Sequence, residues 1–145
     1  MEIAEISVSY SSSKMQKPRI TSSKLSYELF LSTWNQATIE LQEEFKVMLL
    51  NRYNQVLGIY PLSKGGSAST IIDTKLVYSV ALKCNASSII VAHNHPSGNL
   101  KPSHIDIKIT KKLKEAGGLL DINFLDHIIV TKEDYYSLYD NMDFK

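Results

Sequence analysis

The chain has a single cysteine among its 145 residues, Cys84, so no disulfide can form within it. It also lacks any apolar run that approaches the roughly 18 residues of a membrane-spanning helix. The first ten residues, MEIAEISVSY, have neither the basic flank nor the long apolar stretch of a signal peptide. Net charge is nearly absent, because 16 Lys and Arg stand against 15 Asp and Glu. These absences predict a cytoplasmic protein without a membrane partner, and bulk charge does not indicate a nucleic-acid partner.

The composition that remains is that of an ordinary globular domain, with 43% hydrophobic and 21% charged residues. At this length, folding removes roughly 70% of the surface of the unfolded chain from water, so a core can form without disulfides or a structural metal. A metal site in such a chain is therefore expected to serve chemistry rather than folding.

One folded domain is predicted behind a short N-terminal extension. Ile3, Ile6 and Val8 predict a short strand, and the Ser-rich, basic segment that follows them is typical of a flexible tail. We assign this strand and tail to residues 1–19 and the domain to residues 20–145.

Helices and strands alternate along the domain, which predicts an α/β fold. Apolar residues at helical spacing predict helices over residues 24–36, 73–84 and 103–116, the last of them stopped by Gly117-Gly118. Alternating or continuous apolar residues predict strands over residues 43–51, 55–60, 87–92 and 120–130. Residues 61–70 contain adjacent glycines and predict a mobile flap, and residues 133–141 predict a terminal helix or turn.

The residues with the clearest chemical pattern are His93 and His95, at the carboxyl end of the predicted central strand, and Asp106, eleven positions beyond His95. A turn at Pro96 can aim both imidazoles at one point, and the intervening residues can bring the next helix back over that point. Two neutral His nitrogens and one carboxylate oxygen form a common catalytic zinc set, with a fourth position open for water. The spacing therefore predicts a metal site at these three side chains.

Plainer interpretations exist for each of these residues. Ser103 and Asp106 match a capping box, in which Asp106 would only serve the start of a helix. Each histidine by itself could be a loop residue bonded to the backbone. The occurrence of all three together favours the metal site. Ser103 can cap the helix and also direct its hydroxyl at a group that the metal polarises, because capping uses its oxygen as an acceptor and leaves its proton free to donate.

A hydrolytic metal site also needs a base that is not itself a ligand. Strand alternation places Glu43 on the face of Phe45, and Glu44 on the face of Lys46. Glu43 is therefore the favoured base and Glu44 the second candidate, although without the metal motif both would be interpreted as solvated charges. His127 is interpreted as a core or surface residue, and the alternative is that His127 or Asp126 supports the site by hydrogen bonding.

The pattern His93-x-His95-x7-Ser103-x2-Asp106, with an upstream glutamate, resembles the JAMM (MPN+) zinc metallopeptidase signature. The segments EEFKVMLLNRYNQVL, ALKCNASSIIVAHNHPSGNLKPS and LDHIIV are similar to the bacterial RadC-like branch, once labelled a DNA repair family. The resemblance spans roughly Ile20 to Tyr139. It implies a single-domain JAB/MPN fold, a cytidine deaminase-like mixed sheet flanked by helices.

This resemblance also implies an activity and the residues that perform it. One zinc ion per chain would be held by His93, His95 and Asp106, Glu43 would be the general acid and base, and Ser103 would stabilise an oxyanion. The expected reaction is cleavage of a peptide or isopeptide bond in a peptide or protein substrate.

A second hypothesis is a nucleic-acid binding or processing protein linked to DNA repair, as the RadC label and the lysines near Asp106 suggest. Longer RadC-like proteins carry a helix-hairpin-helix segment ahead of this domain, whereas about twenty residues precede the first predicted helix here, which weakens that hypothesis. A deaminase is not expected, because the H-x-E and P-C-x-x-C elements are absent. A metal-binding module without turnover is a further alternative, and the sequence does not predict the oligomeric state.

Overall fold

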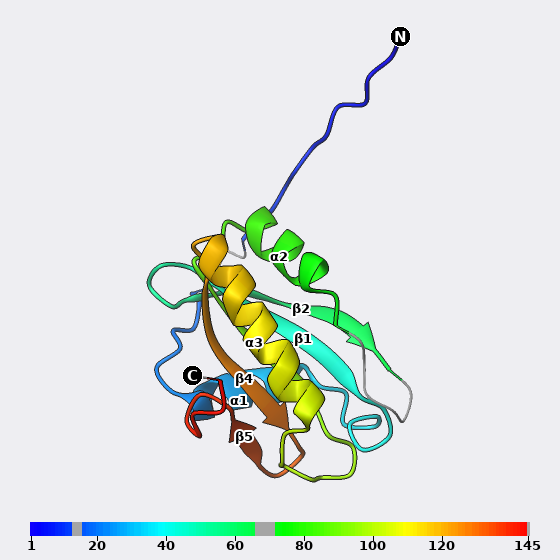
Figure 1. Cartoon of the computed structure of the whole chain (residues 1–145), viewed down its shortest axis with the longest axis vertical. Helices are drawn as coiled ribbons and strands as arrows, with labels where there is room; N and C mark the ends of the chain where they lie inside the picture. Colours follow the sequence, from blue (N-terminus) through cyan, green and yellow to red (C-terminus); the bar gives the residue numbers. More distant parts are fainter. Residues whose placement is uncertain (13–15, 66–71, 145) are drawn as a thin grey trace.

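Helices cover both faces of a five-stranded mixed sheet in the computed structural model, which describes residues 1–12, 16–65 and 72–144 (Figure 1). The strands lie in the order β2-β1-β3-β4-β5, and their bounds are Glu44–Leu50 for β1, Val56–Lys64 for β2, Ser88–Asn94 for β3, Asn123–Val130 for β4 and Tyr135–Ser137 for β5. Strands β3 and β4 are parallel, and the other neighbouring pairs are antiparallel. The predicted α/β class and the mixed sheet are confirmed.

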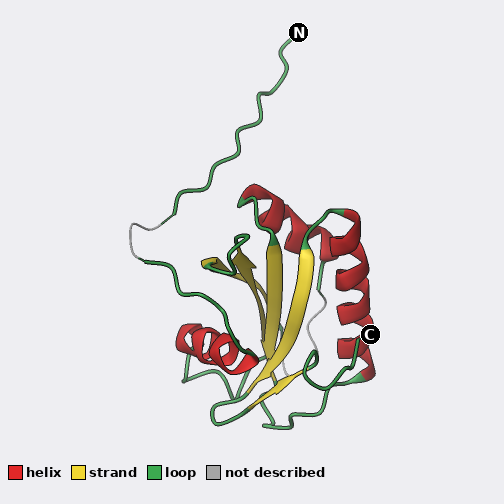
Figure 2. Cartoon of the chain, turned by 90° about the vertical axis from the view of Figure 1, so that its left-hand side faces the viewer, coloured by secondary structure: helices red, strands yellow, loops and turns green. Residues whose placement is uncertain are grey.

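Helix α1 (Ser23–Thr33) lies on one face of the sheet, and helices α2 (Thr74–Lys83) and α3 (His104–Leu119) lie on the other (Figure 2). Because successive strand residues point to opposite faces, β1 supplies both layers of the core. Its residues Phe45, Val47 and Leu49 pack with α2 and α3, whereas Met48 and Leu50 pack with α1. No helix among the described residues is both long enough and apolar enough to span a bilayer.

The middle strand, β3, is buried along its whole length. Its run of apolar residues suits a strand that is covered on both faces. It continues two residues beyond the predicted end at residue 92, since His93 pairs with Phe45 of β1 and Asn94 pairs with Val130 of β4. The prediction that this strand ends at residue 92 is therefore wrong, and His93 is held by the sheet itself.

Asn94 ties the turn that precedes β1 to the end of β3. Its Oδ1 accepts a hydrogen bond from the backbone N–H of Glu44 at 2.7 Å, and its Nδ2 donates to the carbonyls of Ile39 at 2.7 Å and Gln42 at 2.8 Å. The side chain is fully buried, so it would be costly to leave these groups unpaired. The segment that carries Glu43 is thereby fixed beside the end of β3.

Three other predicted elements differ from the structure. Residues 1–12 contain no strand, and their apolar side chains, including Ile3 and Ile6, are exposed on a segment that projects from the body (Figure 1). Strand-like pairing in the N-terminal part occurs instead at Arg19, which forms an isolated antiparallel bridge with Gln55, just before β2. Strand β2 continues through Lys64, so the first part of the predicted flap is strand, and residues 66–70 lie outside the described residues. The predicted terminal helix or turn contains the strand β5, which pairs with β4, followed by turns.

Helix α3 also continues through its two glycines to Leu119, so the prediction that Gly117-Gly118 stops it is wrong. Gly117 serves a close approach instead of a stop. A Cβ atom there would lie 2.5 Å from the carbonyl oxygen of Ile122 and 2.7 Å from the hydroxyl of Tyr78, whereas a Cβ atom on Gly118 would meet nothing within 4 Å. The first glycine therefore lets α3 pack against α2 and the start of β4.

The two glycines should respond in opposite ways to alanine. Gly117→Ala is expected to lower the free energy of unfolding by about 1–3 kcal/mol, because the added methyl group overpacks a closed contact. Gly118→Ala should raise it by about 0.5–1 kcal/mol, because alanine loses less backbone entropy in a helix. Urea unfolding followed by circular dichroism measures both, and equal effects of the two substitutions would contradict the packing role of Gly117.

Candidate metal centre

His93, His95 and Asp106 come together where β3 ends and α3 begins. The two Nε2 atoms are 2.9 Å apart, Nε2 of His93 is 3.3 Å from Oδ1 of Asp106, and Nε2 of His95 is 3.3 Å from Oδ2. They form a group of potential ligand atoms that all lie within 4.8 Å of one another, and residues 1–12, 16–65 and 72–144 hold no second such group. The structure thus assembles the three side chains that the sequence pattern singled out.

Their spacing and chemistry suit a metal ion. A tetrahedral ion with bonds of about 2.05 Å has neighbouring ligand atoms about 3.3 Å apart. The two Nε2 atoms are 2.9 Å apart, and each lies 3.3 Å from one of the two oxygens of Asp106. Two imidazole nitrogens and a carboxylate are also a common ligand set for catalytic metals. The cluster can therefore hold a metal ion and leave part of its coordination sphere open.

The turn after β3 orients His95. Nδ1 of His95 lies 2.5 Å from the carbonyl oxygen of Asn99, and a carbonyl can only accept a hydrogen bond. Nδ1 of this imidazole therefore carries a proton, which leaves Nε2, the nitrogen that faces the cluster, as its candidate ligand atom. Gly98 makes the turn possible, since its φ of 81° is in the left-handed region that glycine adopts without strain, and its N–H donates to the carbonyl of His95 at 2.9 Å.

Asp106 is at once the capping residue and a member of the cluster. Its Oδ2 accepts a hydrogen bond from the N–H of Ser103 at 2.8 Å, and Oγ of Ser103 accepts one from the N–H of Asp106 at 3.0 Å. These reciprocal bonds hold the carboxylate in the orientation in which it meets both histidines. The two interpretations of Asp106 drawn from the sequence therefore describe one arrangement.

Local interactions set the charge of the cluster. Burial acts to raise the pKa of Asp106, but His93, His95 and the N–H of Ser103 together hold that pKa well below its usual range. Burial acts to lower the pKa of His95, yet the Asp106 carboxylate and the Asn99 carbonyl raise it overall. The carboxylate therefore stays ionised, as a metal ligand must.

Glu43 and Ser103 share a cleft with His95, the member of the cluster that lines it. The cleft has a volume of about 470 Å³, and Glu43, His95, Pro96 and Ser103 are among the residues that line it. Glu43 is half-buried and lies just before β1. Glu44 does not line this cleft, because it is buried in β1 and its carboxylate lies 3.8 Å from the amine of Lys64.

His127 and Thr110 also adjoin the cluster. From the sequence, a supporting role for His127 was only the alternative interpretation, and no role was predicted for Thr110. Nε2 of His127 lies 2.7 Å from Nδ1 of His93, and Nδ1 of His127 lies 2.6 Å from Oγ1 of Thr110. Burial, followed by repulsion from His93, lowers the pKa of His127 well below its usual range, so this imidazole is neutral. The sequence feature that could have indicated Thr110 is its place in the predicted helix, one turn after Asp106, where a polar residue lies among apolar ones.

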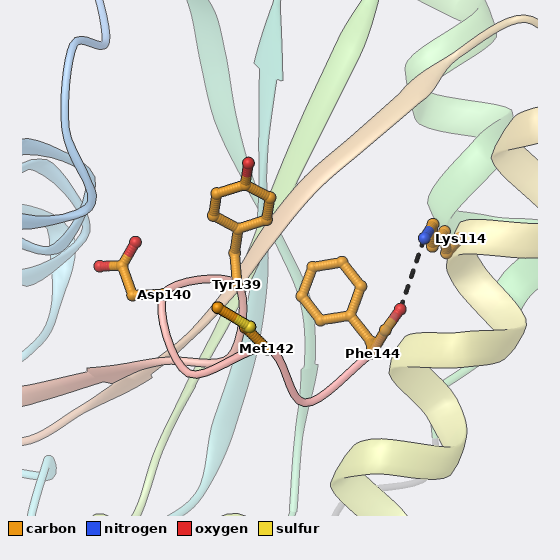
Figure 3. Close-up of a pocket in the computed structure, with 5 residues that line it drawn as sticks. All are labelled: Lys114, Tyr139, Asp140, Met142 and Phe144. Carbon is orange, nitrogen blue, oxygen red and sulfur yellow. Dashed lines mark hydrogen bonds between the residues drawn. The ribbon is translucent and has the colours of Figure 1, made fainter.

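Among the other hollows in the described part of the chain, two differ in their relation to the cluster. A groove of about 510 Å³ also reaches His95 and Pro96, and its opposite wall is the connection from β4 to β5, including Thr131 and Asp134. A hollow of about 320 Å³ near the C-terminus shares no lining residue with the cluster (Figure 3). There the amine of Lys114 lies 3.4 Å from the carbonyl oxygen of Phe144. Only the first of these hollows adjoins the candidate metal centre.

Comparison with known proteins assigns a family to this fold and site. The sequence profile described as RadC-like JAB domain matches residues 20–143. A UPF0758 protein of Flavobacterium johnsoniae is 51% identical over 98 residues, which cover 68% of this chain and 43% of the relative. A UPF0758 protein of Staphylococcus haemolyticus is 41% identical over 123 residues, which cover 85% of this chain and 53% of the relative. The chain thus spans about half the length of these relatives, and their names state no activity.

Metal analysis tests the cluster. We expect the purified protein to bind about one equivalent of a divalent metal per chain, and His95→Ala and Asp106→Ala to lose it, because each removes one of three ligands. His104→Ala is the matched control, since His104 is an exposed histidine in the same part of the chain. Elemental analysis after dialysis gives the stoichiometry, and retention of the metal in both ligand variants would contradict the site.

Proposed function

The chain belongs to the RadC-like JAB domain family, and from this premise we propose that it is a zinc-dependent hydrolase that cleaves a peptide or isopeptide bond. The observation that carries the proposal is the cluster of His93, His95 and Asp106, whose His95 lines a cleft together with Glu43 and Ser103. A set of ligands, a base and a hydrogen-bond donor at one cleft is what metal-assisted hydrolysis requires.

His93, His95 and Asp106 would hold the zinc ion, one per chain. Nitrogen and oxygen ligands at this spacing suit zinc, and three protein ligands are typical of its catalytic sites. When bound, the ion would polarise the scissile carbonyl and make a water molecule more acidic.

Glu43 is the proposed general base. Its carboxylate accepts a proton as the oxygen of water bonds to the carbonyl carbon, and it returns that proton to the nitrogen as the bond between carbon and nitrogen breaks. Water and the amide thus become a carboxylic acid and an amine. Glu43 suits this role better than Glu44, since Glu43 lines the cleft beside His95 whereas Glu44 is buried against Lys64.

Ser103 is the proposed oxyanion donor. Its Oγ already accepts the capping hydrogen bond from Asp106, so its hydroxyl proton is directed elsewhere. The side chain is exposed and lines the same cleft as Glu43. A donor placed there stabilises the negative charge that develops on the carbonyl oxygen during attack.

The grooves around His95 favour an extended peptide as substrate. The cleft that contains Glu43 and the groove that reaches Asp134 both border His95 and Pro96. A scissile bond placed at His95 would therefore have room for chain on both sides. This arrangement supports a peptide or protein substrate over a small amide.

A role with nucleic acid is the second candidate, and exposed lysines favour it. Lys101, Lys108, Lys111 and Lys112 are exposed on the loop before α3 and on α3 itself. Such lysines can contact phosphates, and binding of this kind weakens steeply as salt rises. A fluorescence titration with a labelled DNA duplex and a labelled single strand at low salt tests it, and the absence of binding removes this candidate.

The choice of base can be tested with two neighbouring variants. Glu43→Gln should keep zinc but lower kcat by about 100-fold or more, because it removes the proton acceptor and no ligand. Glu44→Gln is the matched control and should keep most of the activity. The assay uses zinc-loaded protein with a fluorogenic peptide library and isopeptide-linked lysine peptides. Loss of zinc in Glu43→Gln, or equal loss of turnover in both variants, would rule out Glu43 as the base.

A further inference from the structure

Three buried side chains form a line that leads away from the candidate metal centre. It runs from Nδ1 of His93 to Nε2 of His127 over 2.7 Å, and from Nδ1 of His127 to Oγ1 of Thr110 over 2.6 Å. All three side chains are almost completely shielded from solvent. The ring of Phe45 packs against both imidazoles, with ring centres 5.8 Å from His93 and 5.5 Å from His127.

The far end of this line determines where its protons lie. Oγ1 of Thr110 is 2.7 Å from the backbone carbonyl oxygen of Asp106, and a carbonyl cannot donate. The single hydroxyl proton of Thr110 must therefore occupy that contact. The contact between Thr110 and Nδ1 of His127 also needs a proton, so His127 must supply it from Nδ1.

The same counting continues to the metal centre. A neutral His127 that is protonated on Nδ1 has a lone pair on Nε2, so the proton in the contact with His93 must come from Nδ1 of His93. Nε2 of His93 then carries a lone pair, and this is the atom that faces His95 and Asp106. If the order were reversed, a proton would stand on Nε2 of His93, where no metal could bind.

We propose that Thr110 and His127 are positioning residues, which hold His93 as the tautomer protonated on Nδ1 and so present its Nε2 lone pair to the metal. The inference rests on the proposed function only in assuming that a metal binds at His93. The assignment of protons to the ring nitrogens follows from the hydrogen-bond contacts alone. Thr110 lies one helical turn after Asp106, so α3 supplies both a ligand and the residue that ends the line of hydrogen bonds.

Nuclear magnetic resonance of the ¹⁵N-labelled full chain tests the order of protons directly. Two-bond correlations between ring protons and ring nitrogens report which nitrogen of each imidazole is protonated. We expect His127 to carry its proton on Nδ1, with Nε2 unprotonated, in both the metal-free and the zinc-loaded protein. A proton on Nε2 of His127 in either state would overturn the proposal, whether or not the protein hydrolyses any substrate.

Thr110 offers a matched pair of variants for the effect on zinc. Thr110→Val keeps the shape of the side chain and removes the hydroxyl, and we expect zinc affinity to fall by about 10- to 100-fold, the usual effect of losing a partner of a metal-bound histidine. Thr110→Ser keeps the hydroxyl and should bind zinc within about 3-fold of the wild type. Competition with a chromophoric zinc chelator measures both, and equal affinities of the two variants would overturn the proposal.

A second pair of variants, at His127, tests the proposal independently in case Thr110→Val does not fold. His127→Gln places a carboxamide oxygen near the position of Nε2, where it can accept from Nδ1 of His93, whereas His127→Leu offers no acceptor. We expect Gln to preserve most of the zinc affinity and Leu to lose it by about 10- to 100-fold. Failure of the wild-type protein to bind zinc would refute the proposed function, whereas zinc binding that is insensitive to all four variants would refute the positioning role alone.

Discussion

The packing of α3 across the parallel pair β3 and β4 is the constraint on which the candidate site depends. Leu113 of α3 joins Ile89, Val91 and Ile129 of these strands in one apolar cluster. This contact brings the first turn of α3, with Asp106, over the end of β3, and it brings Thr110 down onto His127 of β4. The ligands and their buried partners are thus held by the same apolar contact that stabilises the fold.

Strand alternation gives neighbouring residues of β3 separate tasks. His93 points toward α3 and joins the candidate metal centre, whereas Asn94 points to the other face and binds the turn before β1. The candidate metal ligand and the support for the segment that carries Glu43 are therefore adjacent in sequence and on opposite sides of the sheet. Because both side chains are buried, each needs its full set of partners, and the relative position of ligand and proposed base is correspondingly well defined.

Polar groups around the centre serve more than one purpose. The Asp106 carboxylate completes a capping box and faces both histidines, and its backbone carbonyl receives the Thr110 hydroxyl. Ser103 caps the helix while its proton is left for another acceptor. Such shared use explains how a chain of 145 residues can carry the candidate metal centre without a separate element for each part.

The sequence by itself determined the α/β class, most helices and strands, and the group of His93, His95 and Asp106, because apolar periodicity and a short motif depend on residues close together in the chain. The tertiary structure alone decided that His93 belongs to β3, that Gly117 serves a close contact, and that His127 lies against His93. His127 is 34 positions from His93, and their contact depends on the register of β3 against β4 and on the packing of α3 over both. Spacing along the chain does not encode such a register, since the register results from the burial of apolar side chains throughout the sheet.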